Sequence, residues 1–385
     1  MKKLRVGVLY GGRSGEHEVS VASAASILRH IDRTRYEPFA VRIEKDGRWV
    51  IADRPPTAMS AAEVIEQARV QAARPVRRGR DTLLVAHPSP ETLVTIERQP
   101  SASGDVDAAR ITTLGLDVVF PVLHGPYGED GTVQGLLELA NVPYVGPGVL
   151  ASAAGMDKAV MKQLFAGRGL PLVKWMGFIR RDWERDPAAV TASAVALGLP
   201  LFVKPANLGS SVGISKVKTA DAFAAAVELA LEFDRKVIVE AGVEDAREIE
   251  CAVLGNDDPE ASVPGEILPS REFYDYEAKY VDAASRTVIP AELTARQAAT
   301  VQRLSLEAFR AIDAAGMARV DFLMARRSGK IYVNEINTIP GFTTISMFAK
   351  LWEASGVGYA ALVDRLIQLA VARHAEKQRL RTSVL

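Results

Sequence analysis

The segment at residues 203–216 joins two short apolar runs through a loop rich in glycine and serine. Residues 199–204 are typical of a buried strand and residues 213–217 of a second strand, whereas a helical pattern begins only at residues 221–233. The Walker A loop and the dinucleotide fingerprint Gly-x-Gly-x-x-Gly both open a helix, and their glycine spacings do not match this segment. The fold must therefore present these glycines at the tip of a strand hairpin.

The composition of this loop favours phosphate binding. Gly209 and Gly213 supply a permissive backbone, and Ser210 and Ser211 supply hydroxyl groups. Successive peptide N–H groups at such a tip form a concavity that binds anions. Lys204 closes the preceding apolar run, and burying its ammonium requires an anionic partner. We therefore predict a phosphate site at this hairpin.

A second hairpin is predicted nearer the C-terminal end of the sequence. Residues 318–325 and 330–337 read as two strands, and the intervening Arg-Ser-Gly at 327–329 fits a three-residue loop with glycine in the left-handed position. This loop length predicts that Arg326 pairs with Lys330.

The register of that hairpin brings acidic side chains together. It places Asp321 opposite Glu335, and strand alternation puts Asn337 on the same face. Oxygen donors with no His or Cys nearby suit Mg²⁺ bridging nucleotide phosphates better than zinc. Two further lysines complete the predicted phosphate site: Lys158, which begins a predicted helix, and Lys279, in a polar and aromatic loop.

Length and charge limit the possible classes of protein. A chain of 385 residues exceeds the usual size of a single core, so two or three domains are expected. The 47 basic and 47 acidic residues give a formal net charge of zero, which favours neither nucleic acid nor an anionic membrane surface. The single Cys251 excludes an internal disulfide, and it is expected to be a packed thiol. With no signal-peptide pattern and no apolar run long enough to span a membrane, we expect a cytoplasmic protein.

The first 145 or so residues alternate between strand and helix patterns, which predicts a parallel sheet. A strand at residues 4–10, a Gly-Gly turn and a helix at residues 20–30 begin this part, but the spacing of a dinucleotide oxidoreductase is missing. Residues 54–110 are rich in Ala, Arg, Pro and Ser with weak periodicity. We interpret them as a variable insertion with little chemistry.

Several short motifs occur together and in a fixed order along nearly the whole chain. They are Gly11-Gly-Arg-Ser-Gly-Glu-His-Glu-Val-Ser20, His124-Gly-Pro-Tyr-Gly-Glu-Asp-Gly131, Met156-Asp-Lys158, residues 203–213, Phe273-Tyr-Asp-Tyr-Glu-Ala-Lys-Tyr280, Ala318-Arg-Val-Asp321 and Asn334-Glu-Ile-Asn-Thr-Ile-Pro-Gly341. In this combination the sequence resembles the D-alanine–D-alanine ligases of the ATP-grasp superfamily.

The resemblance implies a mixed α/β and α+β architecture. An N-terminal, Rossmann-like parallel-sheet domain at residues 1–146 would bind the first D-alanine. It would be followed by two ATP-grasp subdomains, a central one at 147–243 and a C-terminal one at 244–385, with the glycine loop closing over the triphosphate. Family members are usually homodimers, so a homodimer is expected.

The implied reaction joins two D-alanines at the expense of ATP, for peptidoglycan precursor synthesis. ATP phosphorylates the carboxylate of one D-alanine, and the amine of the second displaces phosphate. Asp321, Glu335 and Asn337 would carry two Mg²⁺ or Mn²⁺ ions, which neutralise charge that otherwise repels the attacking carboxylate.

The resemblance also implies roles in nucleotide binding. Lys158 and Lys204 would hold phosphates, and Lys279 would reach the transferred γ-phosphate. Glu240 would meet the adenine edge and Glu248 the ribose hydroxyls. The full set implied for ATP, with its hinge at Ala241 and Val243, is Lys158, Lys204, Ser210, Ser211, Glu240, Ala241, Val243, Glu248, Phe273, Lys279, Asn334 and Glu335.

Four residues are implied at the two amino-acid sites. Glu16 would pair with the ammonium of the first D-alanine, and Arg319 and the N–H of Gly341 would stabilise the oxyanion at its carbonyl. Ser346 would take the carboxylate of the second D-alanine. Other readings of two of these residues are that Glu16 begins a helix and that Ser346 caps one.

Further residues are implied around the lid. Ser210 and Tyr280 would join Glu16 in a hydrogen-bond network that closes the lid, and His124 would lie beside the first substrate. A tyrosine at position 280 favours the peptide-forming branch over relatives that make a D-alanine–D-lactate ester.

Two alternatives remain besides peptide ligation. A related ATP-grasp ligase making the ester or another dipeptide would keep the phosphate and metal residues, but not Glu16, Tyr280 and Ser346 together. A noncatalytic nucleotide-binding sensor predicts erosion of Arg319 or of the metal-binding set, and all of these residues are present.

Overall fold

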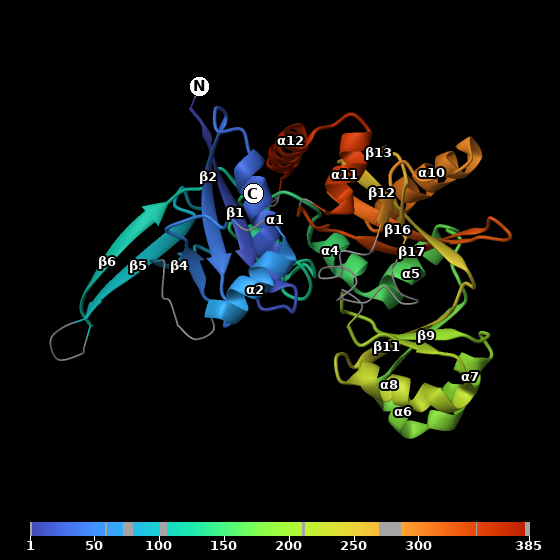
Figure 1. The fold of residues 1–385 in the computed structure, drawn as a ribbon. Coiled ribbons are helices and arrows are strands. Elements are labelled where there is room, and N and C mark those ends of the chain that lie inside the picture. Colours follow the sequence, from blue (N-terminus) through green and yellow to red (C-terminus); the bar gives the residue numbers. More distant parts are fainter. Residues whose placement is uncertain are drawn as a thin grey trace.

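The computed structural model of the protein contains three sheets that lie one after another along the chain (Figure 1). It describes residues 2–57, 60–71, 80–100, 106–209, 212–268, 286–343 and 345–381. The predictions for Ser210, Ser211, Phe273, Lys279 and Tyr280 lie outside the described residues.

The first sheet has seven strands in the order β6-β5-β4-β3-β2-β1-β7. Strand β1 pairs in parallel with β2 and β7, as the strand–helix alternation predicted, and the remaining pairs are antiparallel. Its strands and the neighbouring helices are β1 (Leu4–Gly11), α1 (His17–His30), β2 (Tyr36–Ile43), β3 (Trp49–Ile51), α2 (Ala61–Gln71), β4 (Arg80–Leu84), β5 (Leu93–Pro100), β6 (Val106–Leu114), β7 (Val118–Pro121), α3 (Thr132–Leu139) and α4 (Val149–Met156).

Residues 54–110, interpreted from the sequence as a variable insertion with little chemistry, form regular secondary structure. This part of the chain contributes α2 and the strands β4, β5 and most of β6, which extend the sheet by antiparallel pairing. Figure 1 shows β5 and β6 as a ribbon projecting away from the rest of the protein. The run Leu93-Val-Thr-Ile96, rich in β-branched residues, was the available signal for a strand.

Small residues let α1 pack closely on β1. Ser20 lies at the contact, where its hydroxyl accepts a hydrogen bond from Gly11 N at 2.7 Å and donates to the carbonyl of Val122. The helix begins at His17, three residues earlier than the sequence pattern indicated. The first glycine turn is thereby fixed between the strand and the helix.

The second sheet has four antiparallel strands in the order β10-β9-β11-β8. Strands β9 and β10 pair from Val203↔Ser215 onward, so the glycine loop joins two strands and a helix follows only afterwards, which confirms the predicted hairpin. The elements here are α5 (Lys158–Gly167), β8 (Trp175–Ile179), α6 (Arg180–Arg185), α7 (Pro187–Val195), β9 (Leu201–Pro205), β10 (Ser215–Val217), a 3₁₀ turn (Ala220–Ala222), α8 (Phe223–Leu231) and β11 (Lys236–Ala241).

The third sheet follows the order β15-β14-β12-β16-β17, with β13 paired beside β12. Helix α10 packs on its strands, and α11 and α12 follow the last strand. The elements are β12 (Ala246–Gly255), β13 (Glu260–Ala261), β14 (Gly265–Leu268), β15 (Arg286–Val288), α10 (Ala295–Ala311), β16 (Gly316–Ala325), β17 (Ile331–Asn337), α11 (Met347–Ala354) and α12 (Tyr359–Lys377).

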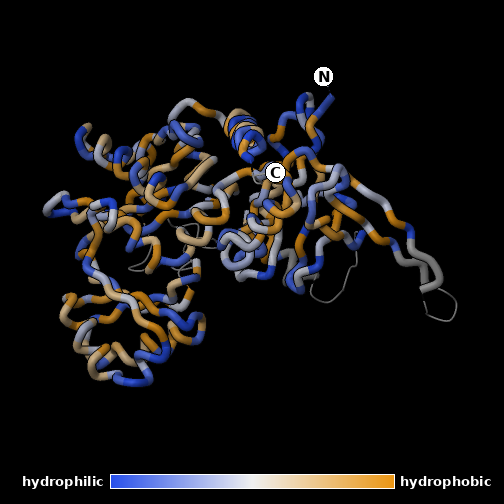
Figure 2. The backbone as a smooth tube through the Cα atoms, turned by 180° about the vertical axis from the view of Figure 1, so that it is seen from behind, coloured by the Kyte–Doolittle hydropathy of each residue, from blue (hydrophilic) through white to orange (hydrophobic). Residues whose placement is uncertain are grey.

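The hydrophobic cores do not follow the three sheets one to one. One core combines β1, α1 and β7 with α11, α12 and strands of the third sheet. The second sheet has a core of its own, formed mainly with α8. Along α12, hydrophilic and hydrophobic residues alternate with the turns of the helix (Figure 2). The first and third sheets are therefore joined through one shared interior, whereas the second sheet is packed separately.

Candidate functional site

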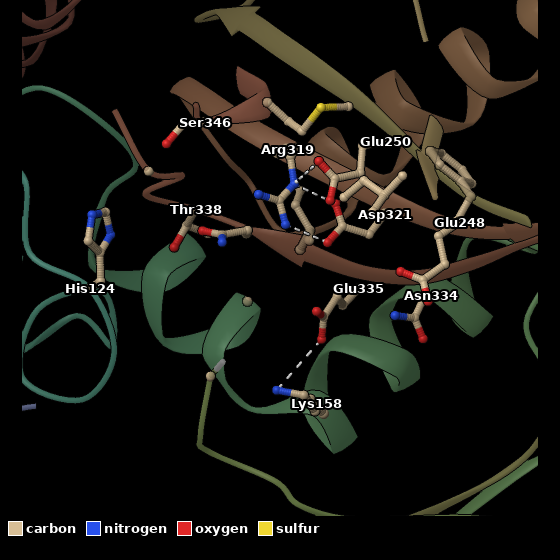
Figure 3. Close-up of a pocket in the computed structure, with 18 of the residues that line it drawn as sticks. His124, Lys158, Glu248, Glu250, Arg319, Asp321, Asn334, Glu335, Thr338 and Ser346 are labelled. Atoms are coloured by element: carbon tan, nitrogen blue, oxygen red, sulfur yellow. Dashed lines mark hydrogen bonds and ion pairs between the residues drawn. The ribbon is translucent and has the colours of Figure 1, made fainter. Parts of the chain in front are cut away.

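A cavity of ≈ 600 Å³ is lined by strands of the second and third sheets, by α1 and by loops that follow strands of the first sheet. Figure 3 shows that the labelled side chains from the third sheet face the cavity together with Lys158, on α5. Of the predicted site residues that the structure describes, those lining the cavity are Glu16, His124, Lys158, Lys204, Glu240, Ala241, Glu248, Arg319, Asp321, Asn334, Glu335, Asn337, Gly341 and Ser346. Val243 lies beyond the end of β11 and does not line it.

Three carboxylates form a row across the third sheet. Glu250 on β12 pairs with Asp321 on β16, which pairs with Glu335 on β17. Two residues along, Arg319 pairs with Asn337. Directly paired residues in antiparallel strands point to the same face, so all five side chains share the face toward the cavity. This confirms the predicted pairing of Asp321 with Glu335.

The predicted pairing of Arg326 with Lys330 was wrong. Ala325 N bonds to Lys330 O, so the loop is one residue longer than expected and the register near the turn is shifted by one. A β-bulge then restores the register, because Phe322 pairs with Val333 but Asp321 pairs with Glu335, which leaves Asn334 as the extra residue. Bulges of this kind re-aim side chains, and here the bulge returns Glu335 to the side of Asp321.

Two carboxylates hold Arg319. Its Nε and Nη2 donate to the two carboxylate oxygens of Asp321, both at 2.7 Å, and Nε also lies 3.0 Å from Glu250 Oε2 (Figure 3). Burial opposes the charge of the guanidinium, but Asp321 and Glu250 outweigh burial and hold the pKa of Arg319 well above its ordinary value. The positively charged guanidinium of Arg319 is therefore held beside the row of carboxylates.

Glu240 bridges two buried lysines. Its carboxylate oxygens lie 2.5 Å from Lys162 Nζ and 2.5 Å from Lys204 Nζ, and Lys162 also donates to the carbonyl of Asn334 at 3.1 Å. Burial alone would raise the pKa of Glu240, but the two lysines outweigh it and lower that pKa to about 2. Glu240 is thus an anionic partner of Lys204 within the protein.

Lys162 is a site residue that was not predicted from the sequence. Lys158 and Lys162 are four residues apart on α5, so they share one helix face. Lys158 Nζ donates to the carbonyl of Leu208, in the glycine loop, at 2.8 Å and lies 3.7 Å from Glu335 Oε2. The spacing of the two lysines was the signal that could have found the second one.

Glu16 brings the first glycine turn against the loop of the second sheet. A Cβ built at Gly125 would lie 3.0 Å from Glu16 Oε2, and one built at Gly209 would lie 3.1 Å from it. Glu16 occupies the N-cap position of α1, but its side chain makes no capping hydrogen bond. The alternative that Glu16 merely begins a helix describes its position but leaves its buried carboxylate unexplained.

His124 and Glu129 stand beside Glu16. The ring Nδ1 of His124 donates to the carbonyl of Ile339 at 3.0 Å, and burial lowers the pKa of the ring, so it is neutral and its Nε2 accepts from Ser23 at 3.3 Å. Burial and the charge of Glu16 raise the pKa of Glu129 to about 8. Burial therefore disfavours the charged forms of both His124 and Glu129, which lie beside Glu16.

Ser346 also lines the cavity, in the turn that follows β17. Its Oγ accepts from Thr343 N at 2.9 Å and lies 2.7 Å from Thr343 Oγ1, and a Cβ at Gly341 would come within 2.9 Å of it. Ser346 is the N-cap residue of α11, but its side chain makes no capping hydrogen bond. Its hydroxyl is thus held in the turn between β17 and the helix.

The donor set on the acidic face fits a hard divalent cation. Asn337 Oδ1 is buried, and no hydrogen bond reaches it from the part of the chain that the structure describes. An orphaned buried oxygen next to Asp321 and Glu335 is what an oxygen-ligated cation would satisfy. In the described residues no cluster of three or more His, Cys, Asp and Glu side chains is arranged to hold a metal alone. Further oxygen ligands must then come from elsewhere, as they do where Mg²⁺ is bound with substrate phosphates.

Two family models match the chain. One, described as D-ala D-ala ligase N-terminus, matches residues 5–147, and the other, D-ala D-ala ligase C-terminus, matches residues 164–368. The chain belongs to the D-alanine–D-alanine ligase family.

Similar proteins extend this family match over the full chain. A D-alanine–D-alanine ligase of Heliobacterium modesticaldum is 49% identical over 380 residues, covering 98% of both chains, and one of Bacillus cytotoxicus is 45% identical over 100% of both. Among solved structures, the D-alanine–D-alanine ligase from Coxiella burnetii has a TM-score of 0.81 at 36% identity and covers 98% of this chain and 97% of that one. The VanG D-Ala:D-Ser ligase from Enterococcus faecalis has a TM-score of 0.75 at 31% identity, covering 96% and 100%.

These structural neighbours confirm the predicted fold class of this family member. Where the structure describes the chain, none of its helices has the length and apolarity that crossing a membrane requires.

Proposed function

We propose that the protein joins two D-alanine molecules into D-alanyl-D-alanine, with ATP converted to ADP and phosphate, in the cytoplasmic synthesis of peptidoglycan precursors. The single observation that carries this is that one cavity is lined by Glu16, by Ser346, and by Arg319 with the acidic row. Such a cavity offers an ammonium site, a carboxylate site and a phosphoryl-transfer site. Family membership supports the same reaction.

The donor D-alanine binds near the first glycine turn. Its ammonium pairs with Glu16, which is buried beside Gly125 and Gly209, and His124 shapes the wall. Arg319 and the N–H of Gly341 face the donor carbonyl. Holding the donor in this way converts an encounter in solution into a step between preset groups.

The donor carboxylate oxygen then attacks the γ-phosphorus of ATP, and the bond from that phosphorus to the bridging oxygen of ADP breaks. Lys158 and Lys204 hold the phosphates, with Lys279 at the transferred group. Lys204 exchanges its contact with Glu240 for phosphate, which frees one carboxylate oxygen of Glu240 for the adenine edge. The remaining nucleotide contacts in this proposal are Ser210, Ser211, Ala241, Val243, Glu248, Phe273 and Asn334.

Asp321, Glu335 and Asn337 would hold two Mg²⁺ or Mn²⁺ ions. Such ions neutralise phosphate charge and so reduce its repulsion of the incoming carboxylate. The buried Asn337 Oδ1 and its acidic neighbours support this assignment.

The acceptor D-alanine binds at the turn before α11, with its carboxylate at Ser346. Its neutral amine attacks the donor carbonyl, the carbon–oxygen bond to phosphate breaks, and the amine loses a proton. Arg319 and Gly341 N–H stabilise the negative charge on the carbonyl oxygen in between. Ser210 and Tyr280 join Glu16 in closing the lid over this step.

The proposal includes three domains, at residues 1–146, 147–243 and 244–385, and a homodimer formed through the N-terminal domain. The three sheets fall within these three segments, which supports the division. Light scattering of the purified protein gives its mass in solution and tests the dimer.

Phosphate release with product identification by mass tests the reaction. The purified protein is given ATP and Mg²⁺ with D-alanine, with L-alanine, and with D-alanine plus either D-lactate or D-serine. We expect D-alanyl-D-alanine as the main product, formed only from the D-isomer. A dominant ester or D-serine product would contradict the acceptor assignment, and ATP binding without turnover on any substrate would leave a nucleotide sensor.

A further inference from the structure

Glu250 is a buried carboxylate to which the proposed reaction gives no role. It lies on β12 directly opposite Asp321, is 6% exposed, and its Oε2 stands 3.0 Å from Arg319 Nε (Figure 3). Burying a charge is costly unless a partner compensates for it, so this position needs an explanation.

Arg319 has two carboxylate partners, and one of them has a second task. The guanidinium forms a two-bond fork with Asp321, at 2.7 Å on each side, while in the proposed function Asp321 is also a metal ligand. A Mg²⁺ ion binds carboxylate oxygens at about 2.0–2.1 Å. At that range the ion and the guanidinium compete for the same oxygens and repel each other.

If Asp321 were the sole partner of Arg319, the position of the arginine and metal binding would depend on each other. Either the arginine would resist metal binding by keeping the fork, or it would lose its partner and its position as the ion bound. Glu250 removes this conflict, because it already contacts the Nε edge of Arg319 and lies on the neighbouring strand, away from Glu335.

We infer that Glu250 is a positioning residue that retains Arg319 at the donor carbonyl when Asp321 turns to the metal. This role rests on the proposed function of Asp321 and Arg319. In the row of three strands, Glu335 and Asp321 serve the cation, and Glu250 serves the arginine. The carboxylates are thereby divided between two positive charges.

The test measures cation binding without turnover. Mn²⁺ affinity is measured by electron paramagnetic resonance with the protein bound to the nonhydrolysable analogue adenylyl imidodiphosphate. We expect Glu250→Gln to weaken Mn²⁺ binding on the order of tenfold, the usual effect of removing an outer partner of a ligand, because Arg319 then holds Asp321 more tightly. An unchanged affinity would overturn the inference.

A double variant shows whether Glu250 affects Mn²⁺ binding through Arg319 or through its own charge. In an Arg319→Gln background, adding Glu250→Gln is expected to change Mn²⁺ affinity less than about twofold, because the competitor is gone, and the two single changes then fail to add. Arg319→Gln alone is expected to bind Mn²⁺ at least as tightly as the unmodified protein. A tenfold loss that persists without Arg319 would show that Glu250 acts on the cation itself.

Glu266→Gln provides a matched control. Glu266 forms a similar buried pair with Arg247 in the same sheet, with contacts of 2.8 and 2.5 Å, but does not line the cavity. This variant is expected to lose stability with no change in Mn²⁺ affinity. The design also distinguishes the two levels of the argument: absence of D-alanyl-D-alanine in the product assay contradicts the proposed function, while the double-variant comparison reports on Glu250 by binding alone.

Discussion

Glu240 carries a single negative charge between two ammonium groups in the interior of the protein. Its side chain is 3% exposed, and the lysines reach it from α5 and β9. Two positive charges near one carboxylate remain acceptable only while that carboxylate is ionised. The stability of this interior therefore depends on the ionised carboxylate of Glu240.

We expect Glu240→Gln to be strongly destabilising. Removing one side of a buried ion pair costs about 3–5 kcal/mol, because the remaining charges have no partner. Urea denaturation near neutral pH measures the change in the free energy of unfolding. As a control, Glu307→Gln breaks an exposed pair with Arg303 and is expected to cost less than about 1 kcal/mol.

The effect of Glu240→Gln should also depend on pH. Glutamate in an unfolded chain titrates near about pH 4.3, whereas the pKa of Glu240 in the folded protein is about 2. The stabilisation is complete above the first value and is lost as pH falls toward the second. The difference between the two proteins should therefore narrow across this window, and a difference that stays constant would contradict the assignment.

Close packing in the turn between β17 and α11 positions the hydroxyl of Ser346, which is proposed to bind the acceptor D-alanine. Gly341 has no side chain to displace Ser346, whose Oγ would lie 2.9 Å from a Cβ at that position. Thr343 fixes the same hydroxyl from the other side. The turn thus leaves Ser346 little freedom to move.

Gly341→Ala is expected to weaken acceptor binding selectively. Displacing Ser346 removes a hydrogen bond to a charged carboxylate, worth about 1.5–3 kcal/mol, so KM for the second D-alanine should rise on the order of tenfold or more. Initial rates over a wide range of D-alanine concentration separate the two KM values. Gly135→Ala, where a Cβ has no neighbour within 4 Å, serves as the control and should leave both unchanged.

The elements differ in how far the sequence predicted them. The glycine hairpin was predictable because the strand and helix patterns around it are strong and local. The pairing of Asp321 with Glu335 was also predicted, but through a loop length that was wrong by one, and the bulge at Asn334 compensated for the error. Loop length and bulges depend on contacts with distant residues, here the bond from Lys162 to the carbonyl of Asn334.

Other parts of the site could not be predicted for similar reasons. The local sequence around Lys162 predicts a lysine on a helix but not its partner. That partner is Glu240, far along the chain. Glu250 acquires its position from pairing with β16, which strand alternation alone does not specify. Residues 54–110 escaped prediction because short strands with exposed faces have weak periodicity.

Helix α12 fastens the first sheet to the third at the scale of the whole molecule. Arg373 donates to the carbonyls of Gly146 and Tyr144 at 2.5 and 3.0 Å, and Asp364 accepts from Tyr36 at 2.5 Å. These contacts join α12 to β2 and to the segment after β7, whereas the lysines proposed to hold phosphate come from α5 and β9.

Arg373→Met is therefore expected to separate the two halves of the site functionally. Losing the paired carbonyl bonds should destabilise the protein by about 1–3 kcal/mol and raise KM for the donor D-alanine several-fold. The dissociation constant of ATP, measured by calorimetry, should change less than about twofold. Arg365, on the same helix, forms an exposed ion pair with Glu260 of β13. Arg365→Met is the control, and it is expected to change neither KM for the donor D-alanine nor the dissociation constant of ATP.

The shared core has a consequence for how the protein is made. Residues of β1 and α1 pack in one interior with Leu362 and Leu366 of α12, which the ribosome adds more than three hundred residues later. During translation the early sheet must wait with an apolar face uncovered, and exposed strand surfaces invite aggregation. Nascent chains that stop before α12 are thus expected to depend on chaperones, even though every residue proposed to bind the donor D-alanine has already been synthesised.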